Sequence, residues 1–260
     1  MPKKFVHDFL IIANSQLNAT NFLIKVQSEK KLPTIKPGQF VNVEIKNSLE
    51  VFLRRPFSVF DVDYKNNVIS MIIKILGRGS EKLTQVQVGD TISLVFPLGK
   101  NFTYPDINDR VLLVGGGSGV APMLFLAKES GLAKEKVDII LGARTREDHI
   151  DVSSYSEYAT LHYASEDGLL GEKGFVTQHS VFTNNLQQYN KIYACGPDGM
   201  MKAVAKEAKA AGVFCEVSLE NLMACGFGVC LCCIEPTTSG NKCVCTDGPV
   251  FNINELQWQI

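Results

Sequence analysis

The chain has 260 residues, of which 45% are hydrophobic and 20% charged, and its formal net charge at pH 7 is −1. This composition is typical of a folded chain of about two domains, and the balanced charge gives no electrostatic reason to expect binding to nucleic acid or to an anionic membrane surface. His7 and Asp8 interrupt the short apolar run near the N-terminus, and no apolar stretch approaches a membrane-spanning length, so we expect no export signal, no membrane insertion and a cytoplasmic location, where thiols stay reduced.

The first hundred residues predict an all-β domain. Short β-rich runs occur at residues 9–13, 21–26, 39–45, 56–62, 68–75 and 91–96, separated by turn residues such as Pro37-Gly38, Asn66-Asn67 and Gly89-Asp90. Strands at this spacing favour an antiparallel β-barrel. We therefore expect an N-terminal antiparallel β-barrel domain over residues 1–104.

From residue 110 the pattern changes to alternating strands and helices. Strand-like runs occur at residues 111–114, 137–141, 161–164 and 191–194, and helical stretches at residues 121–130, 176–184 and 200–211. This order predicts a central parallel α/β domain over residues 105–214, whose last parallel strand ends at Cys195. A small cysteine-rich domain, residues 215–260, follows.

Arg54-Arg55-Pro56-Phe57-Ser58 lies at the start of a predicted barrel strand. Arg55 can pair with a phosphate, Phe57 can lie against an isoalloxazine ring, and Ser58 can hydrogen-bond near the flavin N5 atom. An edge-strand arginine beside a core phenylalanine would leave the same pattern without a ligand. The motif is thus a candidate flavin site and not a diagnostic one.

Residues 77–80, Gly-Arg-Gly-Ser, form a second candidate element in the barrel domain. They follow a predicted strand, and Ser80 begins what reads as a capped short helix. A glycine turn before a helix N-terminus suits a pyrophosphate and favours FAD over FMN. The alternative is a plain strand-to-helix turn.

Residues 111–122 read Val-Leu-Leu-Val-Gly-Gly-Gly-Ser-Gly-Val-Ala-Pro, which is strand, glycine loop and helix start. A dinucleotide site requires this context, although the third fingerprint glycine is absent. The candidate contacts are Gly115, Gly116, Gly117 and Gly119. Arg144 and Arg146 can meet the 2′-phosphate of NADP or be ordinary loop arginines, so the choice between NAD and NADP stays open.

Cys195-Gly196-Pro197 ends the last predicted parallel strand. Small residues at that place let a nicotinamide ring approach a flavin closely. Cys195 can equally be a small buried hydrophobic residue.

Six of the eight cysteines lie in the last 36 residues, and the first four of these are spaced Cys225-x4-Cys230-x-Cys232-Cys233. The C-x4-C-x2-C spacing is that of a plant-type 2Fe-2S loop and selects Cys233 over Cys232. Gly226 and Gly228 let the backbone wrap around a cluster. We expect an apolar collar around the sulfurs, formed by Ala224, Phe227, Val229, Leu231 and Ile234. Such a surface is too apolar to leave in water, so we expect a partner protein to bind there.

The fourth ligand must come from Cys243 or Cys245. These residues lie two apart, so in an extended strand both would face the same way, and geometry leaves the choice open. Structural zinc is the main alternative, but zinc sites usually show two paired knuckles where this chain has a triplet and a distant partner.

The motifs Arg55-x-Phe-Ser58, Gly115-Gly-Gly-x-Gly-x-Ala-Pro122 and Cys195-Gly-Pro-x-Gly-Met200, in this order, resemble the ferredoxin–NADP reductase superfamily. The tail, residues 223–233 and 244–251, closely resembles that of the electron-transfer subunits of NAD-dependent dihydroorotate dehydrogenases. The resemblance extends over essentially the whole chain, and the tail is its most specific part.

This resemblance implies FAD contacts at Arg55, Pro56, Phe57, Ser58, Ile72, Ile73, Lys74, Gly79 and Ser80, and cluster ligands Cys225, Cys230, Cys233 and Cys245. It also implies a separate FMN-containing catalytic subunit that oxidises dihydroorotate in pyrimidine biosynthesis, within a heterotetramer. Electrons would then run from that FMN through the 2Fe-2S cluster and FAD to NAD+.

A hydride passes directly between nicotinamide and flavin, so we expect no catalytic acid or base in this chain. Two other functions fit the same residues. One is an NAD(P)H-dependent flavin and iron-sulfur reductase that serves ferredoxin or another oxidoreductase. The other is a zinc-stabilised binding module whose glycine loops are purely structural.

Overall fold

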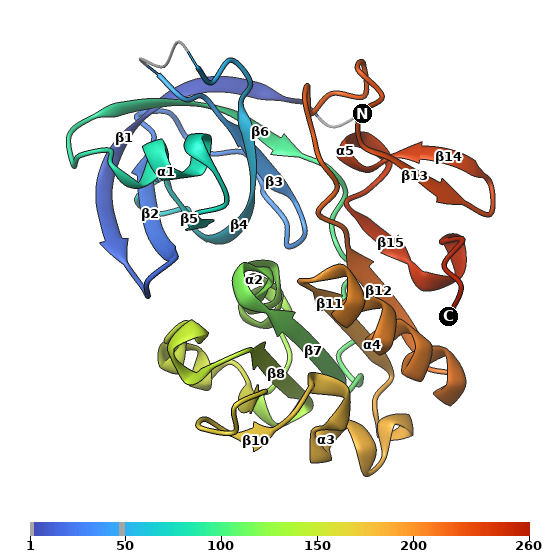
Figure 1. Ribbon diagram of the computed structural model, residues 1–260. Coiled ribbons are helices and arrows are strands. Elements are labelled where there is room, and N and C mark those ends of the chain that lie inside the picture. The colour runs from blue at the N-terminus through green and yellow to red at the C-terminus, as the bar shows by residue number, and fades with distance from the viewer. Residues whose placement is uncertain (1–2, 47–49) are drawn as a thin grey trace.

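The computed structural model describes residues 3–46 and 50–260. Within these residues the N-terminal part is a closed antiparallel barrel with strand order β1-β2-β5-β4-β3-β6 (Figure 1). The strands are β1 (Phe5–Gln16), β2 (Asn21–Gln27), β3 (Phe40–Val43), β4 (Arg55–Asp63), β5 (Val68–Lys74) and β6 (Thr91–Leu98), with the short helix α1 (Arg78–Thr84) between the last two. The predicted barrel is confirmed, and each predicted strand has its counterpart.

The barrel interior is filled by residues that alternate along the strands. On β5, Ile69, Met71 and Ile73 all point into this core, as the two-residue repeat of a strand requires. Phe9 and Phe96 cross the centre with their rings edge to face at 5.1 Å. The side chain of Ile72 points to the opposite face of β5 and packs with the residues of the second unit.

The second unit is a sheet with strand order β10-β9-β8-β7-β11-β12-β15. Its strands are β7 (Val111–Gly116), β8 (Val137–Ala143), β9 (Thr160–Ser165), β10 (Glu172–Lys173), β11 (Lys191–Cys195), β12 (Phe214–Ser218) and β15 (Val250–Asn252). All neighbours pair in parallel except β15, which runs antiparallel to β12. The predicted parallel α/β unit is confirmed.

Two details of that prediction are wrong. Cys195 does not end the last parallel strand, because β12 pairs with β11 and sets Ser218 beside Cys195. The helix expected at residues 176–184 is broken into a 3-10 turn and the single-turn α3 (Ser180–Thr183). His179 causes the break: its backbone is extended, and its imidazole Nδ1 accepts the N–H of Val181 at 3.1 Å. The predicted domain boundary at 214/215 stays a prediction; the sheet has strands on both sides of it.

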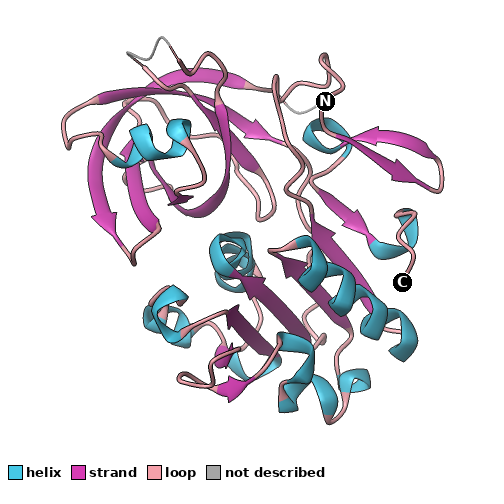
Figure 2. Ribbon diagram, in the orientation of Figure 1, coloured by secondary structure: helices cyan, strands magenta, loops and turns pink. Residues whose placement is uncertain are grey.

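Helices cover both faces of the sheet (Figure 2). Leu113 and Tyr193 pack on the face of α2 (Val120–Glu129), whereas Leu112 and Ile192 pack on the face of α4 (Asp198–Ala211). Helix α2 lies between the sheet and the barrel (Figure 1). Its Phe125 side chain belongs to the core of the barrel. The two units therefore share a packed junction.

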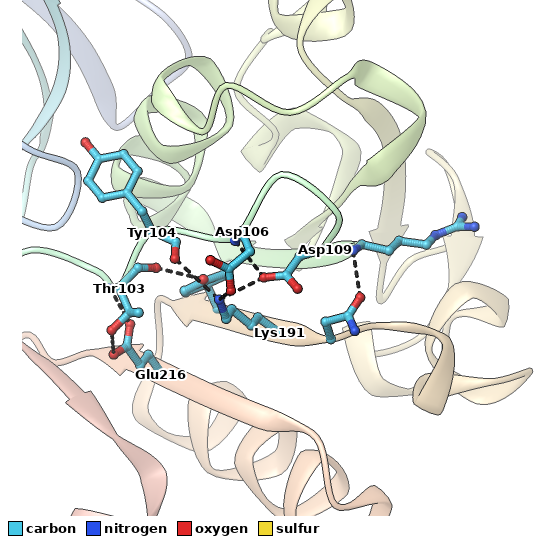
Figure 3. Close-up of polar contacts among 9 residues, drawn as sticks. Thr103, Tyr104, Asp106, Asp109, Lys191 and Glu216 are labelled. Atoms are coloured by element: carbon cyan, nitrogen blue, oxygen red, sulfur yellow. Dashed lines mark hydrogen bonds and ion pairs between the residues drawn. The ribbon is translucent and has the colours of Figure 1, made fainter.

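Polar contacts fix the segment that joins the two units to the sheet (Figure 3). Glu216 of β12 accepts hydrogen bonds from the backbone N–H and the hydroxyl of Thr103, at 2.8 and 2.7 Å. The Lys191 Nζ atom lies 2.8 Å from an Asp109 carboxylate oxygen and 3.3 Å from one of Asp106. These contacts attach the joining segment to strands β11 and β12 of the sheet.

After β12 the chain returns to the barrel, forms the hairpin β13 (Ile234–Thr237) and β14 (Gly240–Cys243) and the one-turn α5 (Val244–Asp247), and re-enters the sheet as β15. The start of β1 lies beside this C-terminal segment (Figure 1), where Lys4 sits over the ring of Phe227. Among the described residues, none of the helices has both the length and the apolar character needed to cross a membrane.

Candidate flavin, nicotinamide and cluster sites

A cavity of about 670 Å³ lies where the barrel, the start of α2 and the segment after β12 meet. Helix α2 and the loop before it contribute Ala121 and Ser118, and the end of β12 with the segment after it contributes residues 218–223. The barrel domain contributes Arg55, Pro56, Phe57, Ser58, Ile72, Lys74, Gly79 and Ser80. The two barrel motifs singled out in the sequence therefore line one space, although they are separated along the chain.

Ile73 is the exception among the predicted flavin contacts. Its side chain points into the barrel core, while Ile72 and Lys74 on either side line the cavity. The strand repeat explains the difference, because neighbouring side chains on β5 face opposite ways.

Arg54, which precedes β4, and Arg55, which begins it, have different surroundings. The Arg54 guanidinium donates to the carbonyl oxygen of Ser93 at 2.9 Å and to its hydroxyl at 3.1 Å, which ties it to β6. Arg55 lines the cavity and donates to the Leu53 carbonyl at 2.8 Å. A Cβ atom on Gly79 would lie 2.8 Å from the Arg55 Nε atom, so glycine leaves room for this guanidinium. A cation at the wall suits an anionic ligand group.

Ser80 shapes the turn before α1. Its hydroxyl accepts the backbone N–H groups of Leu76 and Gly77, at 2.8 and 3.1 Å, and donates to the Gly77 carbonyl at 2.9 Å. It occupies the third position of the helix and not the cap expected from the sequence, since the cap residue is Gly77. The serine therefore holds the glycine turn that borders the cavity.

Cys195 and Glu220 are neighbours in the folded chain. The Cys195 thiol is fully buried and lies 3.9 Å from a carboxylate oxygen of Glu220, which lines the cavity. Burial raises the pKa of the Cys195 thiol, and the Glu220 carboxylate adds to this rise. Desolvation by the surrounding protein also raises the pKa of Glu220, although the positive charge of Lys74 opposes that shift. Sequence reasoning missed Glu220, because one glutamate ahead of a cysteine motif carries no local pattern.

The glycine loop and the Cys195-Gly196 turn pack directly against each other. A Cβ atom on Gly119 would lie 2.4 Å from the Cys195 carbonyl oxygen and 2.6 Å from the Gly196 nitrogen. A Cβ atom on Gly116 would lie 2.7 Å from the Met200 sulfur. The two predicted nicotinamide elements are therefore adjacent, and their small residues make this approach possible. Ser118 of the loop lines the cavity itself.

Backbone N–H groups point at the sulfurs of the C-terminal cysteines. The Phe227 N–H donates to the Cys225 Sγ atom at 3.3 Å, the Gly228 N–H to Cys245 Sγ at 3.1 Å, and the Cys245 N–H to Cys233 Sγ at 3.4 Å. Burial opposes ionisation of Cys225, but hydrogen bonds from the surrounding backbone N–H groups and from the Cys230 thiol outweigh burial and lower its pKa to about 6. Such donors are what a negatively charged iron-sulfur core requires.

The loop glycines behave as predicted. Gly226 and Gly228 have φ angles of +76° and +80°, in the left-handed region that favours glycine. The backbone between Cys225 and Cys230 therefore turns tightly, and the loop fits the wrapping that a cluster needs.

The expectation that Cys243 and Cys245 share one face of a strand is wrong. β14 ends at Cys243 and α5 begins at Val244, so the two side chains are not alternate members of one extended segment. Cys245 is buried beside Cys233, whereas Cys243 is only partly buried and Cys232 is exposed. Geometry thus distinguishes residues that the sequence pattern left equivalent.

The apolar collar lies largely at the surface. Val229 is 81% exposed and Leu231 57% exposed, while Phe227 and Ile234 are somewhat more covered. Leu231 also has a positive φ of 57°. In the chain alone the collar therefore leaves apolar surface in water and gives the sulfurs only partial cover.

Three domain families match consecutive parts of the chain. Residues 12–104 match an oxidoreductase FAD-binding domain, residues 113–206 an oxidoreductase NAD-binding domain, and residues 220–257 the iron-sulfur cluster binding domain of dihydroorotate dehydrogenase B. The fold and site therefore define a flavin- and nicotinamide-dependent oxidoreductase with an iron-sulfur domain, and the expected cofactors FAD, NAD and iron-sulfur cluster are confirmed.

The relatives narrow this class. An electron transfer subunit of dihydroorotate dehydrogenase B (NAD(+)) from Fusobacterium nucleatum is 31% identical over 258 residues, with 97% of this chain and 98% of the relative covered. One from Clostridium perfringens is 37% identical over 246 residues, with 94% and 95% covered. The chain belongs to the family of dihydroorotate dehydrogenase B electron transfer subunits.

Solved structures agree on the fold. A chain of an NADH-dependent reduced ferredoxin-NADP oxidoreductase superposes with a TM-score of 0.85 and 30% identity, covering 96% of this chain and 90% of its own. The ferredoxin reductase of carbazole 1,9a-dioxygenase superposes with a TM-score of 0.70 at 24% identity, covering 81% and 67%, and supports the fold alone.

Proposed function

We propose that this chain carries electrons from the FMN of a separate catalytic subunit, which oxidises dihydroorotate, through a 2Fe-2S cluster and FAD to NAD+. The observation that carries the proposal is the route of the chain around the cavity. Met223 lines the cavity that holds the flavin motifs, and Cys225, the first cysteine of the cluster loop, follows two residues later. One short segment thus joins the flavin wall to the cluster loop.

We assign the flavin to the cavity of about 670 Å³, with Arg55 facing a phosphate, Phe57 and Ser58 beside the ring system, and the turn at Gly79 near the pyrophosphate. When bound, FAD converts two-electron hydride transfer into one-electron steps. Burial of Ile72 beside α2 keeps water from this part of the wall. Ile73 takes part only through its backbone, since its side chain is in the barrel core.

We assign the nicotinamide to the edge of the cavity formed by the glycine loop and the Cys195-Gly196 turn. Gly115, Gly116, Gly117 and Gly119 let the dinucleotide approach the backbone closely. Cys195 and Glu220 position the ring, and the raised pKa of Cys195 keeps its thiol neutral beside the redox centre.

For the cluster we assign Cys225, Cys230, Cys233 and Cys245 as ligands. Side-chain hydrogen bonds link Cys225 with Cys230 and Cys233 with Cys245, and Cys245 also interacts electrostatically with Cys225, so all four side chains lie within reach of one another. A two-iron core is held by four thiolates, and these cysteines would supply them. The backbone N–H groups that point at the sulfurs would offset the charge of the core.

The partner contact is assigned to the exposed collar around Val229 and Leu231. A second subunit would remove this apolar surface from water and bring its own redox centre near the cluster loop. We further infer a heterotetramer of two such pairs and a cytoplasmic location, where the C-terminal thiols remain reduced until a cluster is built.

The test is anaerobic purification followed by measurement of iron, acid-labile sulfide and FAD. We expect two irons, two sulfides and one FAD per chain, NADH oxidation with artificial acceptors, and dihydroorotate oxidation only after the FMN subunit is added. Stoichiometric zinc without sulfide, or turnover of dihydroorotate by the chain alone, would overturn the proposal.

A second candidate is a reductase that exchanges electrons with ferredoxin. The superposition on the NADH-dependent reduced ferredoxin-NADP oxidoreductase favours it, because that match covers nearly the whole chain, the cluster region included. The two functions differ in the partner. Co-purification with an FMN-containing subunit would select the first function. Reduction of ferredoxin by NADH as fast as reduction of the artificial acceptors would select the second.

A further inference from the structure

Strand β3 touches both the proposed flavin site and the cluster loop. Asn42 of β3 lies opposite Pro56 of the flavin motif in the β3–β4 ladder, and Phe40 of the same strand lines the cavity. The Asn42 side chain donates from Nδ2 to the carbonyl oxygen of Cys225 at 3.2 Å. Asn42 is only 2% exposed, so this hydrogen bond is shielded from water.

The surroundings of Asn42 indicate that the hydrogen bond to Cys225, and not the filling of space, accounts for an asparagine at this position. The amide oxygen Oδ1 has no hydrogen-bond partner within the described ranges 3–46 and 50–260, although it is buried. An unpaired buried acceptor lowers stability, so an apolar residue would serve better if the position needed only filling. The Cys225 carbonyl also fixes the amide orientation, because only the NH2 group can face an acceptor.

The loop approaches Asn42 very closely. A Cβ atom on Gly226 would lie 2.8 Å from the Asn42 Nδ2 atom. The next residue, Phe227, donates its N–H to the Cys225 sulfur at 3.3 Å, and Lys4 at the start of the barrel lies 5.4 Å from the centre of the Phe227 ring. Asn42 therefore holds the peptide before Gly226, and Lys4 contacts the side chain of the residue after it; the peptide between Gly226 and Phe227 directs its N–H at the sulfur.

We propose that Asn42 is a positioning residue that fixes Cys225 against the flavin-bearing strands and thereby sets the potential of the cluster and the rate of one-electron exchange with the flavin. This rests on the proposed function, which makes Cys225 a cluster ligand. No bond forms or breaks at Asn42. Each NADH delivers two electrons as a hydride, and these pass one at a time to two equivalents of a one-electron acceptor.

The test compares Asn42→Leu and Asn42→Ala with the control Asn21→Leu in the full chain loaded with FAD and cluster. Asn21 is a buried barrel asparagine whose Oδ1 atom is likewise unpaired, but its contacts are with Asn18 and Thr20. Stopped-flow absorbance reports flavin reduction by NADH, freeze-quench electron paramagnetic resonance (EPR) reports cluster reduction, and a redox titration gives the cluster potential.

Both Asn42 variants are expected to shift the EPR g-values and make the cluster potential more negative, because the N–H bond to the sulfur loosens. Loss of one buried hydrogen bond changes an equilibrium constant roughly fivefold. We expect the rate of cluster reduction to fall by about the same factor. Flavin reduction should stay at the wild-type rate. Loss of the cluster with FAD retained, confined to the Asn42 variants, supports the proposal as well.

Unchanged g-values, potential and rate in both Asn42 variants would overturn the proposal, as would an equal change in Asn21→Leu. Failure of both Asn42 variants to retain FAD would also overturn it, since Asn42 would then be a structural barrel residue. Only one part of the proposed function matters here, Cys225 as a cluster ligand, and its failure is distinguishable because the wild-type chain would then lack iron and sulfide. A different electron partner would leave this test unaffected.

Discussion

At the scale of single residues, neighbouring side chains of one type have separate tasks. Arg54 is tied to β6 through Ser93, whereas Arg55 lines the cavity beside Gly79. The dipeptide alone gives no sign of this difference. It arises because β4 begins at Arg55, and Arg54 just before it points toward β6 while Arg55 lines the cavity.

Arg55→Ala is expected to weaken FAD binding by about one to two orders of magnitude, because a charge-assisted hydrogen bond to phosphate contributes roughly 1.5–3 kcal/mol. FAD retained through gel filtration, relative to iron, measures the effect. Arg144→Ala is the control, since Arg144 is 80% exposed in the other unit. Equal retention in all three proteins would show that Arg55 is an ordinary surface arginine.

The cysteines allow an internally controlled series. Serine at 225, 230, 233 or 245 should abolish or strongly perturb the EPR signal of the reduced cluster, because a hydroxyl is a poor substitute for a thiolate ligand. Serine at 232 or 243 should leave the signal nearly intact, since Cys232 is exposed and Cys243 lies outside the α5 turn that carries Cys245. A normal EPR signal in Cys245→Ser together with loss of the signal in Cys243→Ser would show that Cys243 is the fourth ligand.

At the scale of elements, the cluster loop depends on glycine backbones. Gly228 has φ +80°, and a Cβ atom there would lie 3.0 Å from the Thr246 methyl group of α5. Gly228→Ala should cost about 1–2 kcal/mol for the left-handed conformation alone and also displace the N–H that bonds Cys245. We expect lower iron content and an altered EPR signal.

Gly212→Ala is the matched control for this substitution. Gly212 ends α4 with φ +69°, and a Cβ atom there would have no neighbour within 4 Å. Both variants should lose similar stability in urea, but only Gly228→Ala should lose iron. Equal iron loss in both would trace the defect to general instability.

Elements that are encoded by a local residue pattern could be predicted from the sequence. Elements that form only through contacts with a distant part of the chain could not. The barrel strands and the strand–glycine loop–α2 unit carry periodicity and turn residues, so their positions were predictable. β15 has only three residues, and it forms because Val217 of β12 lies opposite Phe251. Glu220 and Asn42 likewise gain their importance only when the folded chain brings them to Cys195 and Cys225.

At the scale of the whole molecule, the relative placement of barrel and sheet creates the cavity, and the joining segment maintains it. Glu216 accepts both donors of Thr103 from a buried position in β12 (Figure 3). Burial raises the pKa of this carboxyl, and the Thr103 hydrogen bonds oppose the rise without cancelling it. The carboxyl group at this junction therefore binds its proton more tightly in the folded chain than in the unfolded chain.

This difference in proton binding gives the stability a defined pH dependence. Because the folded chain binds the Glu216 proton more tightly than the unfolded chain, the contribution is complete below the unfolded pKa of about 4.3 and is lost as the pH rises through the raised folded pKa. Glu216→Gln removes the titration and keeps one acceptor for Thr103, so its free energy of unfolding should lie within about 1 kcal/mol of wild type. Urea unfolding from pH 4 to pH 8 should show wild type losing stability relative to this variant as the pH rises. Glu207→Gln, on the exposed face of α4, should keep the wild-type profile. Parallel curves for wild type and Glu216→Gln over the whole range would mean that Glu216 titrates alike in the folded and unfolded chains.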